Sequence, residues 1–248
     1  STGLFYWLCG ILLIFTAGAK VVYIATGGEA RAEFLQNIRE AEGQELARKF
    51  AVGKHLGEFL GTESSGTKTL LITKGPSLTD GEGDSAFQRG LTEGLSVSAP
   101  VAGTAIVPRP TPPKVVATGP DRGVKTEKEF DYLTPAFFDE AVDSHPQCGL
   151  VVCTTGLPKE LAKMKFWKKE DSDRPKLVLV NTPLSPVLKP LKLGFVAAVI
   201  VSNPRLEERV ELNEKSAKEV FDASCLVIRA DNLDEMEKHY PALFQAAR

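Results

Sequence analysis

The sequence predicts an α/β fold, in which a mostly parallel sheet with helices on both faces follows an N-terminal transmembrane helix and a helical stalk. Three features support this prediction. An uncharged apolar run opens the chain, a charge-rich helical segment follows it, and after residue 68 short apolar runs alternate with helical patterns. Near-continuous apolar strands that alternate with helices are typical of a parallel sheet covered on both faces.

Composition narrows the class of protein. The chain has 248 residues and a formal net charge of -2, a length that suits one or two domains with a proper core. No basic stripe is present, so we expect no nucleic-acid partner. The four cysteines, one of which is Cys9, show no C-x-x-C spacing, and we predict neither a metal site nor a cofactor.

Residues 1–28 are predicted to form a transmembrane anchor. The apolar segment 4–25 would span about 33 Å as a helix, enough for a hydrocarbon core of about 30 Å. Tyr6 and Trp7 lie near one end and Tyr23 near the other, as interfacial aromatic residues do. A cleaved signal peptide would need a basic start and a shorter apolar core. We therefore expect a single-pass protein of the cell membrane, with the bilayer as a partner of residues 4–25.

The charges after this segment favour one side of the membrane. Lys20 lies near the end of the apolar segment, Arg31 and Arg39 follow it, and no Lys or Arg precedes it. The positive-inside rule then places the bulk of the chain in the cytoplasm. The charge difference is small, so an extracytoplasmic domain stays open as the alternative.

Residues 29–60 are predicted to form a helical stalk. Phe34, Ile38, Leu46 and Phe50 recur at multiples of four, with most charges between them. The stalk either packs one face on its own domain or docks a partner subunit.

The stretch GTESSGTKTLLIT, residues 61–73, is close to the phosphate-binding pattern G-x-x-x-x-G-K-[ST]. A working phosphate loop follows a strand and opens a helix, so that backbone N–H groups face the anion. Here the loop follows a helix and leads into a strand, and Lys68 comes one residue late. We therefore predict a flexible hinge over 61–68 and no nucleotide site.

Residues 69–248 are expected to form one α/β domain. Asp84 or Ser85 caps one helix, and Thr134 before Pro135 and Leu157 before Pro158 open two others. The Pro-rich excursion 96–113 interrupts the alternation, as either an extended edge segment or a partner-binding loop. The predicted strands are 69–73, 114–118, 150–154, 177–181, 196–202 and 225–229.

The ends of these strands are the candidate site, because ligands of open parallel sheets bind outside the carboxyl ends of the strands. Small polar residues gather there and would suit a small polar ligand. The same residue types also serve as turn residues and helix caps, and this structural role remains an alternative. The candidates are Thr73, Lys74, Ser77, Thr118, Asp121, Thr154, Thr155, Asn181 and Asn203.

The succession TLLITKGPS, SAFQRGLTEGL, KVVATGPD and FFDEAVDSHPQCGLVVCTTG resembles one lobe of the type 1 periplasmic-binding-protein fold. The resemblance covers roughly residues 67–230 and rests on the order of elements. The resemblance implies an extracytoplasmic domain. It also implies binding without catalysis, since members of that family bind sugars, amino acids or peptides between two lobes. This chain departs from the family because its length covers one lobe and a fraction.

An enzyme has little support in the sequence. His55, His145 and His239 do not neighbour a serine or cysteine in a known nucleophile setting, and no G-x-S-x-G occurs. Cys153 ends an apolar run, where a buried thiol is expected rather than a reactive one.

The function that we expect is a membrane-anchored, non-catalytic binding or assembly subunit of a membrane protein complex. Its partners would be other membrane-protein subunits, bound through the stalk or the Pro-rich loop. The alternative is a ligand-binding sensor or an enzyme that binds a small polar ligand at the carboxyl ends of the strands, which we call the strand-end rim.

Overall fold

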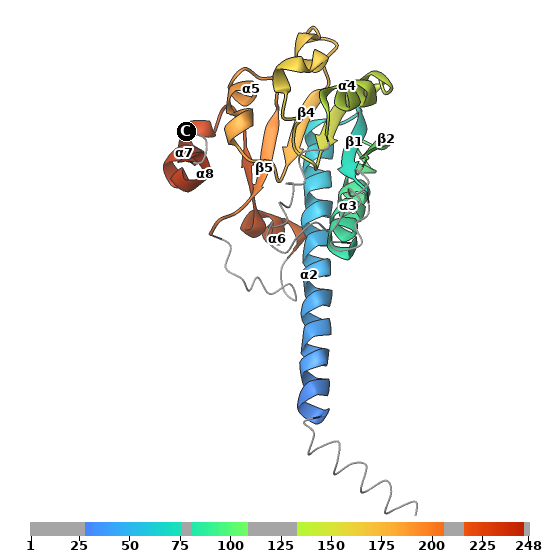
Figure 1. The fold of residues 1–248 in the computed structure, drawn as a ribbon, viewed down its shortest axis with the longest axis vertical. Coiled ribbons are helices and arrows are strands. Elements are labelled where there is room, and N and C mark those ends of the chain that lie inside the picture. The colour runs from blue at the N-terminus through green and yellow to red at the C-terminus, as the bar shows by residue number, and fades with distance from the viewer. Residues whose placement is uncertain (1–27, 76–80, 109–132, 206–215, 246–248) are drawn as a thin grey trace, which may run out of the picture. The chain divides into compact units, whose positions relative to one another are not determined.

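The structure is a computed structural model, and it describes residues 28–75, 81–108, 133–205 and 216–245 (Figure 1). By its internal contacts the chain divides into two units, Ser1–Leu46 and Ala47–Arg248. The described residues of the first unit belong to helix α2 (Gly28–Glu63), where Gln36 Nε2 donates to Glu40 Oε1 at 2.8 Å. The second unit contains the rest of α2 and the sheet.

Six strands form one sheet in the order β2-β1-β3-β4-β5-β6. Neighbouring strands from β2 to β5 are parallel, and β6 is antiparallel to β5. The predicted α/β fold with a mostly parallel sheet is therefore confirmed. The strands are β1 (Lys68–Lys74), β2 (Val101–Val107), β3 (Cys148–Cys153), β4 (Lys176–Val180), β5 (Ala198–Ser202) and β6 (Cys225–Ile228).

The strand register explains why the central strands are apolar along their whole length. Alternate residues of a strand point to opposite faces, and both faces of this sheet are covered. Register partners therefore form rows that belong to one face or the other. One row is Leu71, Val152, Val178 and Ala198, and the row on the opposite face is Ile72, Cys153, Leu179 and Val199.

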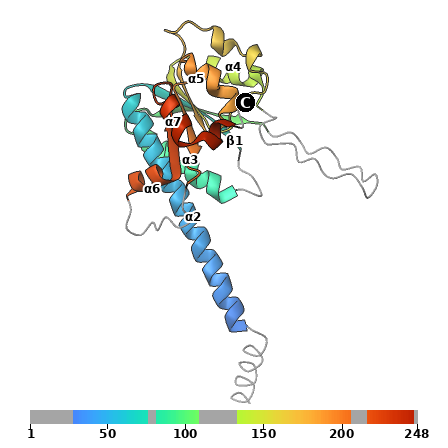
Figure 2. The ribbon, with the colours of Figure 1, turned by 90° about the vertical axis from the view of Figure 1, so that its left-hand side faces the viewer.

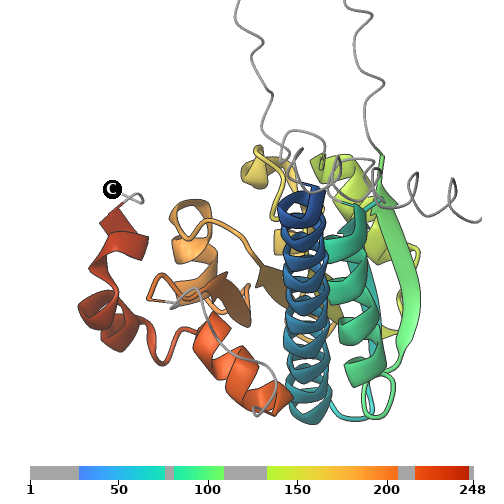
Figure 3. The same cartoon turned by 90° about the horizontal axis from the view of Figure 1, so that it is seen from below.

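One face is covered by α2 from Ala47 onward, α3 (Gly81–Leu95) and α6 (Ala217–Ser224), which lie side by side in Figure 3. Leu56 of α2 and Leu91 of α3 are fully buried against the sheet, and Phe221 of α6 joins the same cluster. We call this the glycine face, because α2 and α3 touch through glycines.

The contact between α2 and α3 leaves no room for side chains at the crossing. A Cβ placed on Gly57 would overlap the carbonyl oxygen of Leu91 and would lie 2.8 Å from the backbone nitrogen of Leu95. A Cβ on Gly94 would likewise overlap the carbonyl oxygen of Lys54. The two helices run parallel here with their backbones in contact, an approach that only small residues allow.

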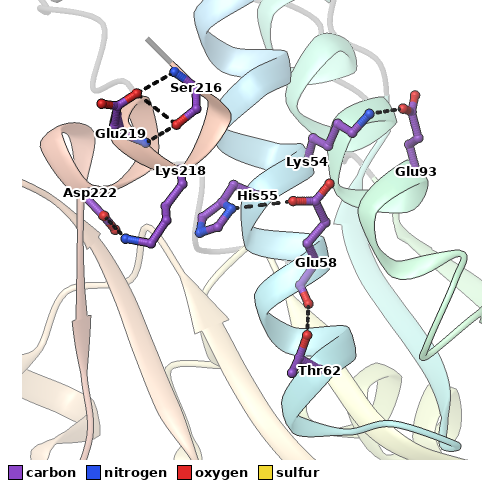
Figure 4. A network of polar contacts seen from close by, with 9 residues as sticks. All are labelled: Lys54, His55, Glu58, Thr62, Glu93, Ser216, Lys218, Glu219 and Asp222. Atoms are coloured by element: carbon purple, nitrogen blue, oxygen red, sulfur yellow. Dashed lines mark hydrogen bonds and ion pairs between the residues drawn. The ribbon is translucent and has the colours of Figure 1, made fainter.

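Polar contacts flank this apolar layer (Figure 4). Lys54 Nζ of α2 lies 2.6 Å from Glu93 Oε1 of α3. On the other side of α2, the ring of His55 packs on Phe221 with centroids 5.2 Å apart. Ser216 caps α6 reciprocally with Glu219, which satisfies the first amide groups of that helix.

The other face is covered by shorter elements (Figure 2). Most of them contribute a buried side chain to one apolar cluster. Its centre is aromatic. The ring of Phe166 meets that of Phe138 edge to face at 5.5 Å and that of Trp167 at 5.1 Å. We call this the aromatic face. The elements are α4 (Pro135–Asp143), η2 (Leu161–Lys163), η3 (Lys165–Lys168), η4 (Ser185–Val187), α5 (Leu188–Lys192), α7 (Leu233–His239) and α8 (Pro241–Gln245).

The helix expected after Pro158 is replaced by the two short 3-10 turns η2 and η3. The carboxylate of the buried Asp139 accepts the backbone N–H groups of Lys165 and Phe166, at 2.8 and 3.0 Å. Those amides are therefore not available to an α-helical ladder, and the chain turns instead. By contrast, the start expected at Thr134 is present, since Thr134 Oγ1 accepts from Phe137 N at 3.2 Å.

The segments on either side of β1 differ in part from the expected boundaries. Helix α2 continues to Glu63, so the stretch 61–68 contains a helical turn, a short connection and the first residue of β1. Within the excursion 96–113, residues 101–107 form β2 at the edge of the sheet. The strand expected at 114–118 lies outside the described residues.

The predicted single-pass membrane protein is corrected here. The apolar segment 4–25, on which that prediction rests, lies outside the described residues. Among the described helices, none is long and apolar enough to cross a membrane. Helix α2 has the length, with 36 residues, but charged side chains recur along it.

Candidate functional site

The strand order reverses at β1, which has β2 on one side and β3 on the other. The connection through α3 lies on the glycine face, and α4, which precedes β3, lies on the aromatic face. The chain leaves the carboxyl end of β1 toward the glycine face, and after β3 it passes to the aromatic face through Leu157 and Leu161. In open α/β sheets this switch point is where ligands bind.

Two of the predicted threonines meet at this point. Thr154 Oγ1 lies 3.1 Å from Thr73 Oγ1, and Thr154 N donates to the carbonyl oxygen of Ile72 at 2.9 Å, which continues the β1–β3 ladder. Thr73 is buried, with 3% of its surface exposed, whereas Thr154 is half-buried. The hydroxyl of Thr73 therefore supports the rim from below, and that of Thr154 lies closer to solvent.

Helix α3 adds a third side chain. Gln88 Nε2 donates to Thr73 Oγ1, so one hydroxyl joins β1, β3 and α3. Gln88 is not among the residues that the sequence singled out. Its position just over one turn after the cap candidate Asp84, in the helix that follows β1, is the signal that points to it.

A compensated pair of charges lies at the same edge. Lys74 Nζ is 2.7 Å from Asp84 Oδ2, and the two side chains are 27% and 40% exposed. Lys74 is the last residue of β1, and Asp84 lies in the first turn of α3. The predicted cap at Asp84 or Ser85 is therefore wrong, because α3 already begins at Gly81. Because the opposite charges cancel, the rim offers donors and acceptors without a net local charge from this pair.

Thr155 contacts the end of β3 rather than a neighbouring strand. Cys153 Sγ lies 3.3 Å from Thr155 Oγ1 and donates to the carbonyl oxygen of Gly156 at 2.9 Å. Burial raises the pKa of the Cys153 thiol to about 11, and its hydrogen bonds offset only part of that rise. Cys153 is thus a protonated core thiol, and not a nucleophile at neutral pH.

The two asparagines at the ends of β4 and β5 differ in role. Asn181 is exposed, adopts a positive φ of 54° and donates its backbone N–H to Ile200 O at 2.8 Å. The side chain of Asn203 is used locally, since Nδ2 donates to Ala223 O at 3.1 Å and Oδ1 accepts from Arg205 N at 3.0 Å. Neighbouring strands lie about 4.8 Å apart, which places Asn181 one strand from Thr154 and Asn203 two.

The structure thus brings Thr73 and Thr154 together. Lys74 follows Thr73 in the chain, and Thr155 and Asn181 lie along the same edge of the sheet. Ser77, Thr118 and Asp121 lie outside the described residues. Among the residues that the structure describes, no three His, Cys, Asp or Glu side chains gather as metal ligands would.

A separate depression of about 670 Å³ lies over α4 and η2. Thr134, Glu140 and Lys163 are among its lining residues. Its buried carboxylate, Asp139, is already bonded to two backbone amides, so this depression offers exposed charges but no preformed site.

No protein-family model matches the sequence, and no match was found among the curated proteins. Among solved structures, the chain is similar to a glucose-galactose binding protein from Geobacillus stearothermophilus, with 15% identity over 77% of this chain and 61% of that chain, at a TM-score of 0.45. An arabinose binding protein from the same organism gives 16% identity, 75% and 62% coverage, and a TM-score of 0.47. A sugar-binding protein of a sugar ABC transporter from Bacillus halodurans gives 9%, 75% and 64%, and 0.48.

The predicted resemblance to one lobe of the type 1 periplasmic-binding-protein fold names the same kind of protein as these matches, whose TM-scores all lie below 0.5. The chain spans about three fifths of the length of these structures, 61–64%.

The expected assembly subunit of a membrane protein complex is corrected. The similar structures are described as sugar-binding proteins, and the described helices include none that crosses a membrane.

Proposed function

We propose that the α/β domain, residues 69–248, binds a small, uncharged, hydroxyl-rich molecule at the carboxyl ends of β1 and β3, without catalysis. The observation that supports this most is the hydroxyl pair of Thr73 and Thr154, 3.1 Å apart at the switch point of the sheet. Two chain segments that are 81 residues apart meet there through side chains that can both donate and accept hydrogen bonds.

The chemistry of the rim favours a neutral ligand with several hydroxyl groups. Threonine and asparagine side chains donate and accept, which suits a hydroxyl group that does the same. The pair Lys74–Asp84 compensates its own charge, so a charged ligand would meet no uncompensated partner in it. We assign Thr154, Lys74 and Asp84 to ligand contact, with Thr155 and Asn181 extending the rim and Ser77, Thr118 and Asp121 as further predicted members.

Thr73 and Gln88 have a different role in this proposal. Thr73 is buried and accepts from Gln88 while it contacts Thr154, so it orients the Thr154 hydroxyl and does not reach the ligand. We propose binding rather than catalysis because the thiol of Cys153, at the end of β3, is buried and has a raised pKa.

Ligand binding to the folded chain can be measured as a shift of its thermal unfolding. Arabinose and galactose serve as neutral probes, and glucuronate and glucosamine as charged counterparts. A ligand at 100 times its Kd stabilises the folded state by about 2.7 kcal/mol, which is readily detected. We expect stabilisation by at least one neutral probe and none by the charged ones.

The residue assignment is tested with Thr154→Val, which removes the hydroxyl and keeps the shape. Loss of one hydrogen bond to the ligand should weaken binding about 3- to 10-fold. Thr62→Val on the exposed side of α2 is the matched control and should leave the affinity unchanged. Equal affinities of Thr154→Val and the unchanged chain, or no response to any neutral probe, would contradict the proposal.

A further inference from the structure

The two edges of the sheet are protected to different degrees. β6 is four residues long, and Arg229, which ion-pairs with Glu63, follows it directly. β2 is seven residues long, VAGTAIV, and contains no charged residue and no proline. Short strands, charges and prolines are the means by which proteins prevent edge-to-edge pairing. β2 is long and uncharged, and the prolines nearest to it, Pro100 and Pro108, lie just outside its seven residues.

The outer edge of β2 is free in the part of the chain that the structure describes, where β1 is the one strand paired with it. From Gly103 to Val107 this pairing is regular, and the shift of register lies at its amino end. A strand at a sheet edge directs unpaired N–H and C=O groups outward, so β2 offers a template for another strand.

The side chains along this edge are exposed on one face. Ala102, Thr104 and Ile106 are exposed, and Ile106 keeps 55% of its surface accessible. Thr104 is the register partner of Leu71, which belongs to the glycine face, so these three side chains lie on the side of α3. Helix α3 covers β1 but leaves them uncovered.

The sequence of β2 is nearly symmetric about its centre. In an antiparallel pair centred on Thr104, Val101 would face Val107 of a second copy, Ala102 would face Ile106, and Gly103 would face Ala105. A two-fold axis requires a surface that is complementary to itself, and this strand meets that requirement without bringing like charges together.

We propose that two copies of this chain associate through antiparallel pairing of their β2 strands, centred on Thr104, so that the two sheets continue into one. The pairing satisfies the outward backbone groups of both copies and covers the exposed Ile106 side chains. The partner is a second copy rather than an unrelated peptide, because near-symmetry about Thr104 is needed only for self-pairing.

The mass of the full chain in solution tests the association. We expect light scattering across the micromolar range to give twice the chain mass of 26.8 kDa. Thr104→Lys places two like-charged side chains directly opposite each other at the axis, with Cβ atoms about 5 Å apart, and it should give the mass of one chain. Thr62→Lys, at an exposed threonine of α2, is the matched control and should remain a dimer.

A cooperative melt and an unchanged circular-dichroism spectrum of the Thr104→Lys monomer would show that the substitution breaks the association and not the fold. A single-chain mass for the unchanged protein at every concentration would overturn the proposal, and so would a dimer that persists in Thr104→Lys.

Cysteine cross-linking tests the register. In a Cys9→Ser, Cys225→Ser background, Thr104→Cys should form a disulfide-linked dimer under mild oxidation, because facing Cβ atoms lie about 4.5–5.5 Å apart. Ala102→Cys alone should not cross-link, since the two positions 102 would be about 14 Å apart along the strands. A mixture of Ala102→Cys with Ile106→Cys should cross-link. Self-linking of Ala102→Cys, or no linking of Thr104→Cys, would show a different interface.

Discussion

The glycine face and the aromatic face cover the same sheet in opposite ways. On the glycine face two parallel helices touch backbone to backbone, at Gly57 and Gly94, and leave no free volume between them. On the aromatic face the covering elements are short, and the rings of Phe138, Phe166 and Trp167 pack edge to face between them. The glycine face should thus be destabilised by added atoms, and the aromatic face by removed atoms.

The difference follows from the length of the covering elements. The part of α2 from Ala47 to Glu63 and helix α3 are long enough to run along the strands, so a close crossing extends over several turns. The elements of the aromatic face have three to nine residues and cannot form such a crossing. On the aromatic face, large rings that pack edge to face provide the buried apolar contact that long helices provide on the glycine face.

The largest effect is expected from removing an aromatic ring. Phe138 is fully buried, and Phe138→Ala should lower the free energy of unfolding by about 3–5 kcal/mol, because the site cannot close around the lost ring. Urea denaturation measures the change. Phe138→Leu, which keeps much of the volume, should cost clearly less; equal losses in both variants would mean that the ring geometry, and not the volume, is decisive.

Adding one methyl group to the glycine face should have the next largest effect. Gly94→Ala places a Cβ against the backbone of α2, so the helices must separate, and about 1–3 kcal/mol should be lost. The same denaturation experiment measures it. A neutral or stabilising result would show that α2 and α3 slide apart freely and that their contact does not define this face.

The folded chain should lose stability at high pH because of the thiol on the aromatic face. The pKa of Cys153 is raised from 9.0 to about 11 by burial, so the folded chain holds this proton more tightly than the unfolded chain. The resulting stabilisation is complete below pH 9 and is lost as the pH rises toward 11, by on the order of 1–2 kcal/mol. Stability between pH 8 and pH 11 should therefore fall less steeply in Cys153→Ala than in the unchanged chain. Parallel curves for the two proteins would contradict the assignment.

The smallest effect should have the opposite sign. Gly43 lies in α2, and a Cβ added to it would meet nothing within 4 Å, unlike a Cβ on the glycines at the α2–α3 crossing. Gly43→Ala should raise the helical stability by about 0.5–1 kcal/mol, because alanine loses less backbone entropy than glycine in a helix. Circular dichroism during thermal unfolding measures the gain. A loss of the size expected for Gly94→Ala would mean that Gly43 also contacts another helix.

The sequence by itself determined the class of fold and several local starts and ends. Runs such as Leu150–Cys153 are apolar at every position, and only a strand buried on both faces needs that pattern. Thr134 before Pro135 marked a helix start that the structure contains, because the threonine hydroxyl satisfies a free amide and proline has none to satisfy.

What only the tertiary structure decided is which distant residues meet. The sequence shows Gly57 as a residue that weakens a helix, but its partner α3 comes about thirty residues later, and the close approach exists only in the fold. The turn at Lys165 depends on Asp139, and the rim depends on Thr73 meeting Thr154 across two strands. Hydrophobic periodicity is a local property and so predicts elements, whereas strand order and helix contacts are set by packing between segments far apart in the chain.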